Sequence, residues 1–138
     1  MSISSFFASL GAPLVNSRWS WGARRPSDGA IFLRVFQEEK WIADGRLHMA
    51  IDWDVELMGD DKRLGYLERK RHVAAIRAGT PCFMIMCSAQ DPSAPPGSWR
   101  IASFNEDDVR VGGKLVDRDG TTYIEVVGRK PAIDMKVR

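Results

Sequence analysis

Residues 16–36, with the sequence NSRWSWGARRPSDGAIFLRVF, constrain the fold more than any other stretch of this chain. Polar and aromatic side chains alternate over residues 18–25, and residues 30–36 form an apolar run that ends in a phenylalanine. Between them, residues 26–29 read Pro-Ser-Asp-Gly, a composition typical of a tight turn. We therefore expect a β-hairpin here.

The first arm of this hairpin carries two tryptophans, Trp19 and Trp21, which strand periodicity places on one face. The other face carries Arg18, Ser20 and Gly22, and the glycine leaves room for another group to approach the backbone. Two indoles beside a hydroxyl and a glycine can stack a flat ring and hydrogen-bond its edge, or they can pack in the core. The sequence leaves both interpretations open.

The length of 138 residues predicts a single domain, 1–138, built around one core. The net charge of +2 results from 20 basic and 18 acidic residues, so the chain has no global basic field. Any affinity for nucleic acid must therefore come from local patches, and short arginine-rich pieces are present in several places.

The two cysteines, Cys82 and Cys87, lie in one apolar run at positions of different parity. They should face opposite sides of a strand, where no disulfide can join them. Reduced thiols predict a cytoplasmic location. No apolar stretch approaches ~18 residues, so neither a transmembrane helix nor a membrane partner is expected.

The remaining segments give a mixed pattern of helices and strands. A short helix is expected over residues 2–10, and one long helix over residues 62–78 with Asp60 or Asp61 as its cap. Further strands are expected at residues 46–53, 82–89, 98–104, 109–116 and 121–127. The predicted fold class is α+β: a curved mixed sheet of about six strands that closes into a small barrel.

The long helix has an unusual apolar stripe, because an arginine falls inside it. The stripe consists of Leu64, Leu67, Ala74, Ala75 and Ala78. Arg71 lies within it, so we expect its aliphatic stem to lie on the core while its head reaches water. Arg69 is expected to be exposed.

Motifs of known catalytic and metal sites are missing from the sequence. It contains no CxxC pair, no His-x₃-His, no GxSxG, no P-loop and no GxGxxG. Its two histidines, His48 and His72, come without a nucleophile motif. No catalytic residue, metal or cofactor is therefore predicted.

Tryptophan is abundant, and arginines stand at both ends of the first hairpin arm. The tryptophans are Trp19, Trp21, Trp41, Trp53 and Trp99. Proteins that take a base out of a helix hold it between aromatic faces and read its edge with small polar groups. They contact phosphates with arginines, here Arg18, Arg24 and Arg25. The hairpin combines these ingredients.

Four short motifs resemble the amino-terminal domain of certain modification-dependent HNH restriction endonucleases. They are Asn16-Ser17-Arg18-Trp19-Ser20-Trp21-Gly22-Ala23, Phe32-Leu33-Arg34-Val35-Phe36-Gln37-Glu38-Glu39, Glu68-Arg69-x-x-His72-x-x-x-Ile76-x-x-Gly79 and Val126-Val127-Gly128-Arg129. Those domains belong with the EVE, ASCH and YTH folds in the PUA-like superfamily. The resemblance implies a barrel-like sheet with helices at its ends, which binds modified bases or RNA and often flips a base into an aromatic cage.

Residue by residue, the resemblance implies a base pocket of Trp19, Ser20 and Trp21, with Arg69 and His72 near the path of the phosphates. Further walls of the cage are expected from Trp41, Trp53 or Trp99. No HNH segment follows in this chain, so cleavage is not implied, and a nuclease would be a further domain or a partner. The expected function is to read a modified base, above all a modified cytosine, in double-stranded DNA.

Two other classes of function stay open at this point. One is an RNA- or nucleotide-binding or -processing protein on the same fold, using a carboxylate and His72. The other is a protein-interaction module whose tryptophans form an apolar patch. The tail after Pro131 is expected to be dispensable, because no turn signal ties down Ile133, Met135 or Val137.

Overall fold

The computed structural model describes residues 1–59, 62–95 and 98–137. They form an α+β fold whose mixed sheet has the strand order β1-β2-β5-β7-β8-β4-β3, with β6 paired to β5. The strands are β1 (Gly22–Arg24), β2 (Ile31–Phe36), β3 (Lys40–Ala43), β4 (Arg46–Trp53), β5 (Cys82–Ala89), β6 (Ile101–Phe104), β7 (Asp108–Arg118) and β8 (Thr121–Pro131). The helical elements are α1 (Ile3–Ser9), η1 (Gln37–Glu39), α2 (Val55–Met58), α3 (Leu64–Arg77) and η3 (Ala132–Asp134). The predicted α+β class, the short first helix and the long helix are confirmed.

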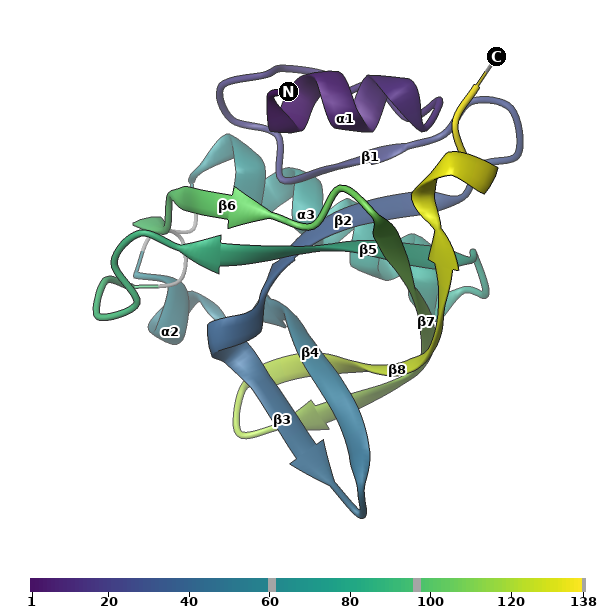
Figure 1. Cartoon of the computed structure of the whole chain (residues 1–138). Helices are drawn as coiled ribbons and strands as arrows, with labels where there is room; N and C mark the ends of the chain where they lie inside the picture. Colours follow the sequence, from purple (N-terminus) through teal and green to yellow (C-terminus); the bar gives the residue numbers. More distant parts are fainter. Residues whose placement is uncertain (60–61, 96–97, 138) are drawn as a thin grey trace.

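All strand pairs in this sheet are antiparallel except β2 with β5, which pair in parallel. The crossover between β2 and β5 contains the β3–β4 hairpin, α2 and α3. Figure 1 shows α1 lying along β1 at one end of the molecule and the β3–β4 hairpin extending at the other. The C-terminus returns to the end that carries α1 (Figure 1).

The expected closed barrel is not confirmed. The sheet runs as an open path from β1 to β3, and no ladder between described strands pairs β2 with β4. The two strands are connected instead through Arg69 of α3, whose guanidinium donates to the carbonyl oxygens of Arg34 in β2 and Ile51 in β4, both at 2.9 Å. A side chain therefore bridges β2 and β4, where backbone hydrogen bonds would close the sheet into a barrel. We call this gap between β2 and β4 the seam.

Two hairpin turns of the sheet are formed by Asp-Gly pairs. Asp44 and Gly45 connect β3 to β4, and Asp119 and Gly120 connect β7 to β8. Each pair has positive φ, at 52° and 73° in the first turn and 50° and 82° in the second. This conformation matches the twist of the flanking strands, and Asp-Gly adopts it readily.

The first hairpin differs from the prediction, because its first strand begins only at Gly22. Upstream, the side chain of Asn16 accepts from the Arg18 amide at 2.8 Å, and its carbonyl accepts from the Ser20 amide at 3.0 Å. These local bonds hold the chain in a turn, since asparagine side chains compete with strand ladders for backbone donors. Trp19 therefore lies in a turn, and the two tryptophans do not share a strand face.

The buried face of α3 also differs from the prediction. Leu64 and Leu67 are 55% and 40% exposed, whereas Glu68 and Arg69 are 3% and 2% exposed. Arg71 lies at the surface, so the predicted roles of Arg69 and Arg71 are reversed. The expected caps, Asp60 and Asp61, lie outside the described residues. Arg69 points inward because the structure beneath the helix presents backbone carbonyls that need donors, and Glu68 points inward to accept from the Ser20 hydroxyl and the Trp21 amide.

The sheet separates two apolar clusters, and β5 contributes to both. Cys87 packs with α1 residues Phe6 and Phe7, whereas Cys82 packs in the cluster that lies under α3. Both thiols are free and buried, and burial raises the pKa of each to about 12. The predicted placement on opposite faces of one strand is confirmed.

The C-terminal tail is docked on the domain, contrary to the expectation that nothing holds it. Ala132 is 1% exposed, and its amide donates to the Asp107 carbonyl at 2.7 Å. The Val137 amide donates to the Ser9 carbonyl at 2.9 Å, and Met135 packs on the first apolar cluster. Over the described ranges, no helix is both long enough and apolar enough to cross a membrane.

Candidate functional site

An open hollow of about 820 Å³ lies where the loop before β1, the start of α3 and the segment before β6 meet. We call it the outer hollow. It is lined by Ile3, Arg18, Trp19, Trp21, Arg34, Lys62, Arg63, Leu64, Gly65, Ser98, Trp99, Arg100 and Ile101. The lining therefore combines three indoles with several basic side chains, and it contains no acidic side chain from the described residues.

Aromatic surface in the outer hollow comes from Trp19 and Trp21, which the sequence predicted, and from Trp99, one of the alternative walls. Trp21 lies directly on Gly65, where a Cβ would overlap the indole ring. Trp99 is 8% exposed, donates through Nε1 to the Ala94 carbonyl, and meets Phe36 edge-to-face at 5.1 Å. Trp19 and Trp21 are only partly buried, so their rings remain accessible from the hollow.

The tryptophan loop is fastened to α3 by Glu68. One carboxylate oxygen of Glu68 accepts from the Ser20 hydroxyl at 3.1 Å, and the other accepts from the Trp21 amide at 3.3 Å. Burial raises the pKa of Glu68, and the bonds from Ser20 and Trp21 oppose that shift. Ser20 is 5% exposed and is not part of the hollow's lining, so the structure places it as an anchor of the loop.

Arg69 of α3 also holds the tryptophan loop, through the Trp21 carbonyl. The prediction that Arg69 contacts phosphate is wrong. Its Nη2 donates to the carbonyls of Trp21 and Arg34, and its Nη1 donates to Ile51, each at 2.9 Å. Burial and the nearby Arg34 lower the pKa of Arg69 to about 10, which still leaves it charged at neutral pH. A guanidinium committed to three carbonyls and 2% exposed cannot reach a ligand outside.

The basic side chains of the outer hollow include several that make no ion pair within the described ranges. These are Arg18, Arg34, Arg63 and Arg100. Arginines without an acidic partner around one concavity give a local positive potential, which attracts phosphates. The outer hollow therefore carries a local basic patch, and most of it comes from residues outside the hairpin's first arm.

Of the predicted phosphate contacts, Arg18 lines the hollow, whereas Arg24, Arg25 and His72 do not. Arg25 forms a bidentate ion pair with Asp28 at 2.6 and 3.0 Å, and this pair lowers the pKa of Asp28 to about 2. Burial and three nearby arginines lower the pKa of His72 to about 4. His72 is therefore neutral at pH 7 and offers no positive charge to a phosphate.

The other two predicted pocket tryptophans lie away from the outer hollow. Trp41 packs in tilted contacts against His48 at 5.0 Å and Tyr123 at 5.1 Å, with the Arg118 guanidinium 4.5 Å from its ring centre. That cluster belongs to the β3–β4 hairpin, β7 and β8. Trp53 ends β4, where a register shift between Ala50 and Asp52 turns its ring to the same side as Ala50.

A narrow recess of about 10 Å³ lies behind Trp21 and Arg34, along the seam between β2 and β4. We call it the inner cleft. It is lined by Trp21, Arg34, Val35, Phe36, Glu39, Ala50, Trp53 and Arg69. Two buried polar atoms of its lining, Glu39 Oε1 and Arg69 Nε, have no hydrogen-bond partner among the described residues. Trp21 and Arg34 line both spaces and separate them.

No group of histidine, cysteine and acidic side chains within the described ranges could hold a metal ion. Comparison of the chain with protein-family models, curated proteins and solved structures finds no match. Fold and site together define a small α+β domain with a basic, tryptophan-lined hollow.

Several residues of the two spaces were not identified as site residues from the sequence. Arg34 sits in an apolar strand, and Gly65, Arg63 and Arg100 lie on segments far apart in the chain. The lone arginine in the apolar run of β2 was a usable signal, because charged residues are rarely buried without a reason. Glu39 offered no comparable signal, since it stands in a polar stretch.

Proposed function

We propose that this domain binds double-stranded DNA and reads a modified cytosine that it takes out of the helix. The observation that carries the proposal is the outer hollow, where the accessible rings of Trp19 and Trp21 face a space bordered by arginines that form no ion pair with another described residue. An extruded base needs an aromatic face for stacking, worth about 1–3 kcal/mol per base. Its flanking phosphates need cations, and the guanidinium groups of Arg18, Arg63 and Arg100 in the lining of the hollow would provide them.

The size of the hollow agrees with this ligand. A volume of about 820 Å³ falls within the range of small-molecule sites and exceeds what a single base requires. The extra space suits a nucleotide together with the phosphates beside it.

In this proposal the sheet, open between β2 and β4, is a PUA-like barrel with an unclosed seam. The domain is the reader part of a modification-dependent restriction system, with a nuclease as partner. A cytoplasmic location completes the proposal.

The proposal is tested by titrating the protein into duplexes that carry one modified cytosine next to 2-aminopurine. We expect 2-aminopurine fluorescence to rise with the modified duplex, because flipping unstacks its neighbour, and to stay low with plain cytosine. Trp19→Ala and Trp21→Ala should each weaken binding about 10- to 100-fold. Trp41→Ala is the matched control and should bind like the parent protein, since Trp41 lies outside the hollow.

The arginines are tested by the salt dependence of the same binding. Arg100→Ala should flatten the slope of log K against log salt by about one, as expected for the loss of one phosphate contact. Arg46→Ala, on the distant β3–β4 hairpin, should leave the slope unchanged. Binding without unstacking, or tryptophan variants that bind as the parent does, would overturn base flipping. Tighter binding of RNA than of modified DNA would favour the RNA-binding alternative.

A further inference from the structure

The inner cleft holds two polar atoms that the fold leaves without partners, and they are chemically complementary. Glu39 Oε1 is an acceptor when the carboxyl is ionised, whereas Arg69 Nε carries a hydrogen and can only donate. Both atoms are buried in the lining of one recess. Because a buried polar atom without a partner costs about 1–3 kcal/mol, this pair calls for an explanation.

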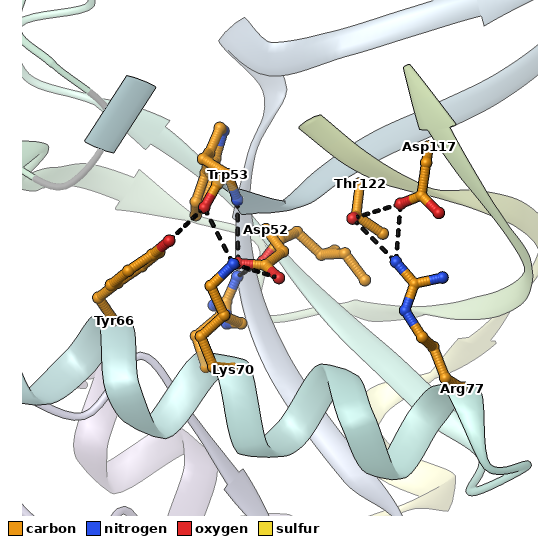
Figure 2. Close-up of polar contacts among 9 residues, drawn as sticks. Asp52, Trp53, Tyr66, Lys70, Arg77, Asp117 and Thr122 are labelled. Atoms are coloured by element: carbon orange, nitrogen blue, oxygen red, sulfur yellow. Dashed lines mark hydrogen bonds and ion pairs between the residues drawn. The ribbon is translucent and has the colours of Figure 1, made fainter. Parts of the chain in front are cut away.

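The position of Glu39 is fixed by Trp53. The other carboxylate oxygen of Glu39, Oε2, accepts from Trp53 Nε1 at 2.8 Å. Trp53 is itself held from α3, since its carbonyl accepts from the Tyr66 hydroxyl at 2.5 Å and from Lys70 Nζ at 3.2 Å. Figure 2 shows Tyr66 and Lys70 reaching from α3 to Trp53 at the end of β4. The contacts of Trp53 with Tyr66 and Lys70 therefore fix the position of the Glu39 carboxylate, whose free oxygen Oε1 lies in the lining of the inner cleft.

Arg34 closes the inner cleft toward the outer hollow. Its guanidinium carbon lies 5.8 Å from the Trp21 ring centre and 5.7 Å from that of Phe36. It makes no ion pair within the described part of the chain, and burial lowers its pKa. A flat cation close to two aromatic rings, with no ion-pair partner among the described residues, occupies the kind of space that a flat base would take. Swinging outward would bring it to the phosphates.

We propose that the inner cleft receives the Watson–Crick edge of the flipped base when Arg34 moves into the outer hollow, and that Glu39 Oε1 accepts from the exocyclic 4-amino group. This inference rests on the proposed function and names the group that reads the base. Arg69 Nε then donates to a ring acceptor of the same edge. Carboxylates are suited to the cytosine amino group, whereas the O4 of thymine would place two acceptors against each other.

The hydrogen bond between Glu39 and Trp53 predicts how the side-chain amide of a Glu39→Gln variant is oriented. Trp53 Nε1 is only a donor, so the glutamine amide must turn its oxygen toward Trp53 and its NH₂ toward the cleft. The cleft then presents a donor where the parent protein presents an acceptor. Preference should shift from 4-amino to 4-oxo pyrimidines, without any change in the size of the side chain.

The experiment compares two duplexes that differ only at one base opposite an abasic site, 5-methylcytosine or thymine, at pH 8, so that neither base has to be unpaired. The comparison is repeated with 5-hydroxymethylcytosine and 5-hydroxymethyluracil. The parent protein should bind the 4-amino base of a pair about tenfold or more tightly, the effect of roughly one well-placed hydrogen-bonding contact. Glu39→Gln should abolish or reverse this preference. Glu56→Gln, an exposed acid on α2, is the matched control and should keep it.

The Arg34→Ala variant tests whether Glu39 or Arg34 recognises the base. We expect this variant to retain the preference for the 4-amino base and to lose about one unit of salt slope. If Arg34→Ala loses the preference while Glu39→Gln keeps it, Arg34 reads the base and the assignment to Glu39 is wrong. Equal binding of both members of each pair by the parent overturns this inference alone. No binding of any of the four duplexes overturns the proposed function as well.

Discussion

The indole of Trp21 lies so close to Gly65 of α3 that a single added carbon at position 65 would overlap the ring. The glycine is therefore what allows the tryptophan loop to dock against the helix with its rings facing the outer hollow. Glycine is otherwise unfavourable inside a helix by about 1 kcal/mol relative to alanine. Its presence in the first turn of α3 is explained by the ring that it accommodates.

This contact predicts the behaviour of Gly65→Ala. The added methyl group should displace Trp21, which we expect to weaken binding of modified DNA at least about tenfold and to shift the tryptophan emission spectrum. Gly128→Ala is the matched control, because a Cβ there meets nothing within 4 Å. Parental affinity together with a shifted spectrum in Gly65→Ala would show that the ring's position does not matter for binding, and an unchanged spectrum would contradict the predicted displacement.

Arg69 and Arg71 should differ in their effect on stability. Arg69→Met leaves three buried carbonyls of the seam without their donor, so we expect a loss of about 3–5 kcal/mol in the free energy of unfolding. Arg71→Met changes a surface side chain and should cost less than about 0.5 kcal/mol. Urea denaturation at neutral pH measures both. Similar losses in the two variants would contradict the role given to Arg69 at the seam.

Glu39 should make the protein less stable as pH rises. Burial raises its folded pKa from 4.5 to about 7, so the folded state holds a proton that the unfolded state releases. The stabilisation is complete below pH 4.5 and is lost as pH rises through 7. Allowing for partial exposure, we expect parent and Glu39→Gln to diverge by about 1–3 kcal/mol between pH 4.5 and 8. Parallel stability curves would refute the shift.

His72 should make the protein less stable as pH falls, over nearly the same pH range. Its folded pKa is lowered from 6.5 to about 4, chiefly by burial, so the unfolded state binds the proton more readily. The contribution to stability is present above pH 6.5 and disappears as pH falls toward 4. His72→Gln should therefore lose less stability than the parent on acidification from pH 7 to 4.5. An identical acid response in parent and variant would exclude this assignment.

Removal of the residues after Lys130 should destabilise the domain. The deletion exposes the contacts of Ala132, Met135 and Val137 with the α1 end of the molecule. We expect the melting temperature to fall by more than about 8 °C, which for a chain of this size corresponds to at least about 1–2 kcal/mol. Deletion of Lys136 and the residues after it provides a milder comparison. A melting temperature within about 2 °C of the parent would mean that the tail is dispensable after all.

Strands, turns and caps that depend only on neighbouring residues were predictable from the sequence. Strands β4 and β5 have the predicted bounds, because each is an unbroken apolar or alternating run between turn signals. Ser2 caps α1, accepting from the Ser5 amide at 3.1 Å. The Asp-Gly turns formed because only a few residues tolerate positive φ. The opposite placement of Cys82 and Cys87 followed from the period of a strand.

Tertiary structure decided how these pieces meet. The helical period alone could not show that α3 turns Glu68 and Arg69 inward. Arg69 depends on carbonyls of three separate segments, those of Trp21, Arg34 and Ile51, and Glu68 depends on the Trp21 amide and the Ser20 hydroxyl. The sequence drew attention to Trp19 and Trp21 as candidate ring binders, but it did not show that Gly65, Arg63 and Arg100 would surround them. Composition and local pattern determine elements, whereas a site of converging side chains is determined by long-range packing that no local pattern records.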